Sequence, residues 1–124
     1  TWMHKNKVDY TNTFCFLMNE KFSDNEIYND ENFLIWKEKW EDRLKLNNNS
    51  QEKYLKLMHS VNPIIIPRNH KVEEALEAAN NGDIEPTNYL IKILEKPYSN
   101  HENISEFQQP NKLKGDKYQT FCGT

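Results

Sequence analysis

Two cysteines are the side chains best suited to covalent chemistry in this sequence of 124 residues. Cys122 lies two positions before the final Thr124, on a polar tail. A thiol near an exposed terminus can ionise to the nucleophilic thiolate, so Cys122 is a candidate redox residue, with an ordinary tail thiol as the alternative. Cys15 stands between Phe14 and Phe16 in a helical pattern, which predicts a buried and inert thiol.

A second candidate site is the polar cluster Arg68, Asn69 and His70, which follows Pro67 and precedes a helical pattern. In a purely structural interpretation, Asn69 caps a helix that starts near His70, and Arg68 pairs with a neighbouring carboxylate. In a functional interpretation, Arg68 reaches a partner domain or a phosphate that the domain holds, because a planar guanidinium suits both. Both interpretations stay open, and we treat the three residues as candidate domain-docking residues.

Sequence patterns for nucleotide and metal binding are missing. A phosphate cradle needs consecutive backbone amides, usually in a glycine-rich loop that opens a helix, and the only glycines are Gly82, Gly115 and Gly123. Neither a P-loop nor the signatures of a protein kinase occur. The four histidines are isolated, and no pair of Cys or His residues has the spacing of metal ligands. We therefore expect no catalytic, cofactor-binding or metal-binding residue in this chain.

The charge pattern and composition exclude several classes of partner. The 16 basic and 19 acidic side chains are interspersed and give a net charge of −3, which favours neither nucleic acid nor an anionic membrane. No apolar run approaches the roughly 20 residues of a membrane-spanning helix. Two cysteines are too few for the disulfide framework of a small secreted domain. We expect a cytoplasmic protein.

Helical periodicity dominates the chain and predicts an all-α fold of about six helices. Apolar residues recur at three- and four-residue spacing around residues 10–20, 31–46, 51–61, 70–80 and 86–96, after a first helix that ends near the N-terminus. Asp9, Asp30 and Ser50 are suitable N-caps for three of these helices. Gly82 suits the left-handed conformation that often ends a helix. Residues 104–107 predict one short helical turn.

Two prolines set the conformation of the segment between them. Pro63 and Pro67 flank three isoleucines, and this favours a buried extended linker over the alternative, a very short strand. The prediction for the whole chain is one orthogonally packed helical domain over residues 1–124, in which residues 97–124 form a mostly irregular tail.

The aromatic residues Phe33, Trp36 and Trp40 recur on one face of a single predicted helix. At this spacing an aromatic stripe is typical of a core face, and a ligand platform is the alternative. The mixed charges of the same helix are interpreted as its solvated face; they comprise Lys37, Glu38, Lys39, Glu41, Asp42 and Arg43.

Several short motifs follow one another over nearly the whole chain. They are Asp9-Tyr10-Thr11 with Phe14, Trp36 and Trp40 with Arg43-Leu44, Asn62-Pro63 through Asn69, Val72-Glu73-Glu74-Ala75, Gly82-Asp83, Lys96-Pro97-Tyr98 and Phe121-Cys122-Gly123-Thr124. No single motif is diagnostic. The ordered set resembles the C-terminal portion of the selenoprotein O (YdiU) family of kinase-like protein adenylyltransferases.

The resemblance implies a parent protein that binds ATP with Mg or Mn in a kinase-like fold and transfers AMP to Ser, Thr or Tyr of protein substrates. It also implies that the nucleotide- and metal-binding residues belong to an upstream kinase-like domain and match nothing in this chain. The resemblance further implies that Cys122 corresponds to the selenocysteine of selenocysteine-containing relatives, and that this terminal cysteine pairs with a cysteine of the upstream region. The pattern departs from the family at Glu85, where a serine-type N-cap before Pro86 is more usual.

We therefore expect a fragment of a longer protein, with a structural and redox-regulatory role beside the kinase-like domain and with an exposed apolar patch when isolated. The alternative is an autonomous helical module that binds a partner protein and has no enzymatic activity.

Overall fold

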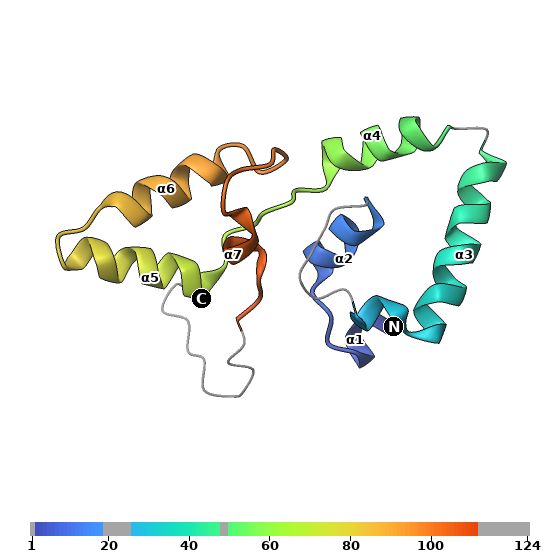
Figure 1. The fold of residues 1–124 in the computed structure, drawn as a ribbon, viewed down its shortest axis with the longest axis horizontal. Coiled ribbons are helices and arrows are strands. Elements are labelled where there is room, and N and C mark those ends of the chain that lie inside the picture. Colours follow the sequence, from blue (N-terminus) through green and yellow to red (C-terminus); the bar gives the residue numbers. More distant parts are fainter. Residues whose placement is uncertain (1, 19–25, 48–49, 112–124) are drawn as a thin grey trace. The chain divides into compact units, whose positions relative to one another are not determined.

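The computed structural model describes residues 2–18, 26–47 and 50–111 of the chain. All regular secondary structure in these three ranges is helical (Figure 1). The elements are α1 (Trp2–Lys5), α2 (Tyr10–Leu17), the 3-10 helix η1 (Glu26–Asn29), α3 (Glu31–Leu46), α4 (Gln51–Val61), α5 (Asn69–Asn80), α6 (Glu85–Leu94) and α7 (Ile104–Gln108). The all-α prediction is confirmed.

The chain divides into two compact units, residues 1–63 and residues 64–124. The first unit contains α1 to α4, and the second contains α5 to α7. The prediction of one orthogonally packed domain over residues 1–124 stays a prediction, because the placement of the two units relative to each other is not determined (Figure 1).

Side-chain caps start three helices of the first unit. The carboxylates of Asp9 and Asp30 and the hydroxyl of Ser50 accept hydrogen bonds from the backbone amides of Asn12, Phe33 and Lys53, respectively. Each bond satisfies an amide that has no partner within its own helix. The three predicted N-caps are therefore confirmed, although α2 ends at Leu17, before the predicted end of that helix.

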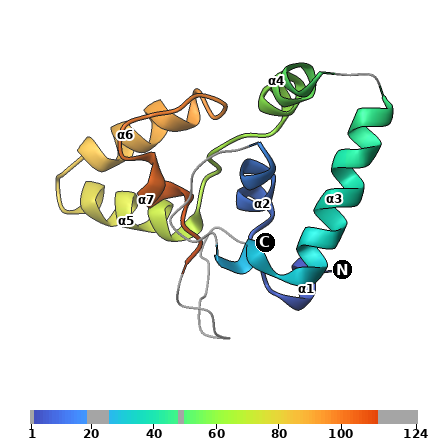
Figure 2. The same cartoon turned by 45° about the vertical axis from the view of Figure 1, so that its right-hand side comes forward.

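The core of the first unit is aromatic. Leu17, Tyr28 and Phe33 are buried at its centre. Partly buried residues pack around them, namely Trp2, Phe14, Phe16, Ile27, Trp40 and Met58. The indole N–H of Trp2 donates to the Asp30 carboxylate at 2.6 Å, which holds α1 against the start of α3 (Figure 2). Rings from α1, α2, η1 and α3 thus meet in one cluster.

Cys15 lies beside this core and is fully buried. Its Sγ donates to the carbonyl oxygen of Pro63 at 3.6 Å, so α2 contacts the end of the first unit. The prediction of a buried Cys15 is confirmed.

The two longest segments of the first unit are poorly covered. Phe33 is the only buried residue of α3, and α4 has none. The prediction that the aromatic stripe of α3 is core is right for Phe33 and partly right for Trp40, but wrong for Trp36, which is 48% exposed. The reason is geometric, because α3 meets η1 at its N-terminal end and then runs away from it (Figure 1).

In the second unit, the segment between the two prolines is buried, as predicted. Ile64 and Ile65 are 3% and 2% exposed, and no strand is assigned to these described residues. The amide of Ile64 donates to the Pro97 carbonyl at 2.8 Å, and its carbonyl accepts from Nε2 of Gln108 at 2.8 Å. The backbone groups of the linker therefore find their hydrogen-bond partners in distant parts of the unit and not in a neighbouring strand.

Helices α5 and α6 lie side by side as a hairpin (Figure 1). Its interface buries Ala75, Leu90 and Ile93, and the hydroxyl of Thr87 donates to the Ala75 carbonyl at 3.1 Å. The turn between the helices depends on Gly82, whose φ of 91° is left-handed. This conformation is costly for a residue with a Cβ and confirms the predicted helix end.

Helix α6 has Ile84 at its N-cap position and no side-chain capping bond, so the prediction that Glu85 takes this position is wrong by one residue. Glu85 is the first helical residue, and its amide donates to the Asp83 carboxylate at 3.1 Å. The Asp83 carboxylate thus accepts a hydrogen bond from one of the first backbone amides of α6.

The predicted short turn near residues 104–107 is α7, which buries Ile104 and Gln108. Residues 112–124 of the predicted irregular tail lie outside the described residues.

Candidate functional site

The candidate redox residue Cys122 lies outside the described residues. Its role stays a prediction from the sequence.

The candidate docking residues surround the start of α5. Arg68 occupies the N-cap position, makes no capping hydrogen bond through its side chain, and is followed by Asn69 as the first helical residue. The prediction that Asn69 caps this helix is therefore wrong by one position. Asn69 is exposed and His70 is half-buried, so both are partly open to solvent. Their proposed docking role is not tested by this placement.

Arg68 has an internal partner. Its Nη2 donates to the carbonyl oxygen of Gln108 at 3.0 Å, across 40 positions in the sequence. The side-chain amide of Gln108 in turn donates a hydrogen bond to the carbonyl oxygen of Ile64. Arg68 therefore connects the start of α5 to the end of α7 and to the buried linker.

Lys71 was not singled out by the sequence, yet it joins two helices. Its Nζ lies 2.8 Å from the Glu74 carboxylate and 2.7 Å from that of Glu106 on α7, and 5.5 Å from the centre of the Phe107 ring. Burial of the ammonium group lowers its pKa, but the hydrogen bonds that it donates to Glu106 and Glu74 outweigh this effect and raise the pKa above its ordinary value. Lys71 therefore stays charged and fixes α7 on α5.

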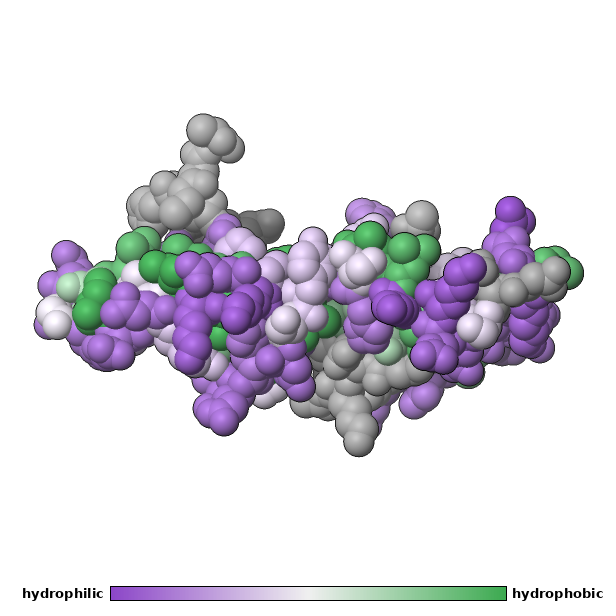
Figure 3. All heavy atoms as spheres, turned by 90° about the horizontal axis from the view of Figure 1, so that it is seen from above, coloured by the Kyte–Doolittle hydropathy of each residue, from purple (hydrophilic) through white to green (hydrophobic). Residues whose placement is uncertain are grey.

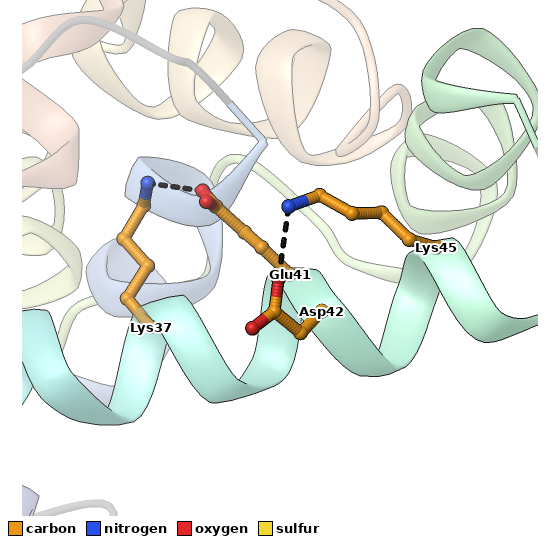
Figure 4. Close-up of polar contacts among 4 residues, drawn as sticks. All are labelled: Lys37, Glu41, Asp42 and Lys45. Carbon is orange, nitrogen blue, oxygen red and sulfur yellow. Dashed lines mark hydrogen bonds and ion pairs between the residues drawn. The ribbon is translucent and has the colours of Figure 1, made fainter.

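The charged side of α3 is neutralised by pairs within the helix (Figure 4). Nζ of Lys37 lies 2.5 Å from Glu41, and Nζ of Lys45 lies 2.9 Å from Asp42. The hydrogen bond to Asp42 raises the pKa of Lys45. These four side chains are partly or largely exposed, which agrees with the predicted solvated face.

An apolar strip crosses α3 and α4, and we call it the outer strip. It comprises Trp36, Trp40, Tyr54, Leu57 and Val61. The rings of Trp36 and Trp40 are stacked, with their centroids 6.2 Å apart. The rings of Trp40 and Tyr54 meet edge to face, with their centroids 6.0 Å apart. Leu57 and Val61 follow Tyr54 at three and seven positions and so share its side of α4.

Much of the outer strip is open to solvent. Trp36 is 48% exposed, Leu57 64% and Val61 61%. Trp36 and Trp40 were predicted to belong to a core stripe, and no prediction was made for Leu57. The spacing of Leu57 from Tyr54 and Val61 is the signal that could have identified it. Figure 3 shows hydrophobic residues at the surface of the molecule, between hydrophilic ones.

In residues 2–18, 26–47 and 50–111, no group of three His, Cys, Asp or Glu side chains is arranged to hold a metal ion. Within the same ranges, no helix combines the length and the apolar character needed to cross a bilayer.

Comparison with models of protein families finds no match. Comparison with curated proteins finds 130 relatives, and the three described here are each named protein nucleotidyltransferase YdiU. The relative from Pelagibacter ubique is 50% identical over 123 residues, which is 99% of this chain and 26% of the relative. Relatives from Nitrosococcus oceani and Clostridium beijerinckii are 42% and 43% identical over 124 and 122 residues, each about a quarter of its own length.

These matches extend over almost the whole of this chain, but the chain spans only about a quarter of the length of the relatives. The predicted resemblance is thereby confirmed. The chain is similar to about a quarter of the length of proteins named protein nucleotidyltransferase YdiU.

Proposed function

We propose that this chain is the C-terminal helical domain of a protein nucleotidyltransferase that transfers AMP from ATP to Ser, Thr or Tyr of other proteins. The observation that carries the proposal is the 50% identity over 99% of the chain with a relative of that name, of which the chain covers only 26%. Identity at this level over the full chain supports a shared role for this portion.

The catalytic step is proposed to belong to the rest of the polypeptide. In this account an upstream kinase-like domain binds ATP with Mg or Mn and receives the protein substrate, and the enzyme acts in the cytoplasm. Support comes from the sequence, where Gly82, Gly115 and Gly123 are the only glycines and none lies in a phosphate-binding loop. No step of the transfer is assigned to residues of this chain.

The role of this chain is proposed to be structural and redox-regulatory. Its helices would support the kinase-like domain, with Arg68, Asn69 and His70 as candidate docking residues, and the Cys122 thiol would tether the tail by pairing with a cysteine of the upstream domain. The S–S bond of such a disulfide forms when the two thiols give up two protons and two electrons to a small disulfide such as oxidised glutathione, which is released as two thiols, and a dithiol reductant reverses the step.

A chimera tests the proposal. The matched quarter of the Pelagibacter ubique relative is replaced by this chain, and the transfer of labelled AMP to a generic protein acceptor is compared with that of the intact relative and of a version without the quarter. We expect the chimera to label the acceptor and the shortened version to lose this activity. A chimera that folds, by circular dichroism, but is no more active than the shortened version would contradict the proposal.

A second candidate function is an autonomous helical module that binds a partner protein. It is favoured by the exposed large apolar side chains, of which Leu46 at 82%, Leu57 at 64% and Val61 at 61% are examples. The chimera separates the two candidates, because an autonomous module has no reason to restore transfer.

A further inference from the structure

We propose that the outer strip of α3 and α4 is the surface on which this chain docks against the remainder of the nucleotidyltransferase polypeptide. This inference rests on the proposed function and assigns a particular surface to it. It differs from the candidate docking residues Arg68, Asn69 and His70, which belong to the second unit.

The first step is that α4 is amphipathic but only half covered. Its apolar side contains Tyr54, Leu55, Leu57, Met58 and Val61. Met58 packs against the aromatic core, while Leu57 and Val61, at the other edge of the same side, remain 64% and 61% exposed. A helix with such a pattern and no buried residue is stabilised chiefly by what packs on its apolar side. Among the described residues, Leu57 and Val61 thus keep most of their side-chain surface open to a partner.

The three aromatic rings of the strip pack against one another. The stacked indoles of Trp36 and Trp40 lie with an interplanar angle of 9°, and Trp40 meets Tyr54 across the two helices. Rings fixed by one another lose little conformational freedom when a partner covers them. Aromatic side chains held in this way, with Leu57 and Val61 alongside, have the character of interface anchors.

The third step concerns the chemistry of the partner. Four charges of α3 form internal pairs, Lys37 with Glu41 and Lys45 with Asp42, and the other four, Glu31, Glu38, Lys39 and Arg43, are two acidic and two basic side chains. Their net charge is zero, so this surface does not select a charged partner. The complementary surface is therefore an apolar face of a folded protein.

The size of the strip favours a tethered partner over a second copy of the chain. A stable dimer needs about 800 Å² per partner, supplied by roughly 20 residues on each side, and a strip of five residues falls short of this. A tethered segment needs far less, since a short linker gives an effective concentration of about 1 mM. The Pelagibacter ubique relative extends well beyond the 26% that this chain covers. The tethered remainder of the polypeptide is the occupant that the strip fits.

The test is hydroxyl-radical footprinting of the isolated chain and of the chimera with the Pelagibacter ubique relative. We expect roughly tenfold slower oxidation of Trp36 and Leu57 in the chimera, because a side chain at an interface is removed from solvent. Ile91, which is 53% exposed on α6, is the matched reference residue in the other unit. Equal oxidation of Trp36 and Leu57 in the two proteins would overturn the proposal.

Matched variants sharpen the test. Leu57→Asp should restore the oxidation of Trp36 in the chimera by roughly tenfold, whereas Ile91→Asp should leave it protected. Both side chains are exposed, so both variants of the isolated chain should keep the helix content by circular dichroism. Protection of Trp36 that survives Leu57→Asp would contradict the assignment of the strip.

The possible outcomes separate this inference from the proposed function. An active chimera with a freely oxidised strip refutes the inference and leaves the proposed function standing. An inactive chimera with a protected strip refutes the proposed function and supports the docking surface. If light scattering shows that the isolated chain is a dimer and Leu57→Asp makes it a monomer, a second copy occupies the strip and the inference is wrong.

Discussion

Replacing Gln108 by Met should loosen the buried linker by an amount that the structure allows us to estimate. Nε2 of Gln108 donates to the Ile64 carbonyl at 2.8 Å, and both residues are buried. Methionine keeps a similar length and volume but has no donor. The Ile64 carbonyl then loses this donor without access to water, which costs about 1–3 kcal/mol.

Hydrogen exchange at the Ile64 amide measures this cost. The amide donates to the Pro97 carbonyl at 2.8 Å, so it exchanges only when the linker leaves its site. A loss of about 1–3 kcal/mol corresponds to exchange about 5- to 150-fold faster, since each 1.4 kcal/mol is about a factor of ten.

Two controls define the result. The amide of Met18, in the first unit, should be unaffected, and Ser105→Ala on the exposed side of α7 should change exchange at Ile64 by less than about threefold. A change of less than twofold at Ile64 in Gln108→Met would refute the reasoning that α7 holds the linker through this hydrogen bond.

Three further predictions concern single contacts. Lys71→Met removes the ion pairs with Glu74 and Glu106 and should destabilise the second unit by about 0.5–1.5 kcal/mol; urea unfolding at low and high salt should show a smaller salt dependence in the variant, and equal dependence would contradict the role of the pairs. Gly82→Ala places a Cβ at a φ of 91° and should cost about 1–2 kcal/mol in a thermal scan, although the Cβ itself meets no atom within 4 Å; an unchanged melting temperature would be inconsistent with the left-handed turn. Asp30 has a pKa below its ordinary value of 3.8, first because of the hydrogen bond from Trp2 and then because of that from Phe33. Its contribution to stability is therefore complete above pH 3.8 and is lost as the pH falls through the lower value of the folded state; the Trp2 indole N–H signal in NMR should shift in that window, and Asp30→Asn should abolish the shift.

Local chemistry explains what the sequence predicted well. Asp9, Asp30 and Ser50 cap helices through an amide only three positions away, and Gly82 ends a helix through its own backbone. Such features depend on neighbouring residues, so their positions can be inferred without knowledge of the fold.

Long-range contacts explain what it predicted poorly. Lys71 reaches Glu106 across 35 positions, and Gln108 reaches Ile64 across 44. No periodicity connects residues so far apart. The spacing of Phe33, Trp36 and Trp40 predicted which side of α3 is apolar, but it could not predict that the core covers Phe33 and leaves Trp36 half exposed. Whether an apolar side is covered depends on elements elsewhere in the molecule.

Asn69 illustrates a third kind of error. Its residue type favours the N-cap, yet the helix starts one position earlier and Arg68 takes that place. The side chain of Arg68 donates to the Gln108 carbonyl. At the start of α5, the N-cap residue therefore makes a tertiary hydrogen bond and not a capping one.

The most direct test of the central claim is an incubation of the isolated chain of 124 residues with α-labelled ATP, Mn and a generic protein acceptor, beside the intact Pelagibacter ubique relative. The account predicts labelled acceptor with the relative and none above background with the isolated chain. Labelled acceptor produced by the isolated chain would contradict the claim that the catalytic step belongs to the rest of the polypeptide.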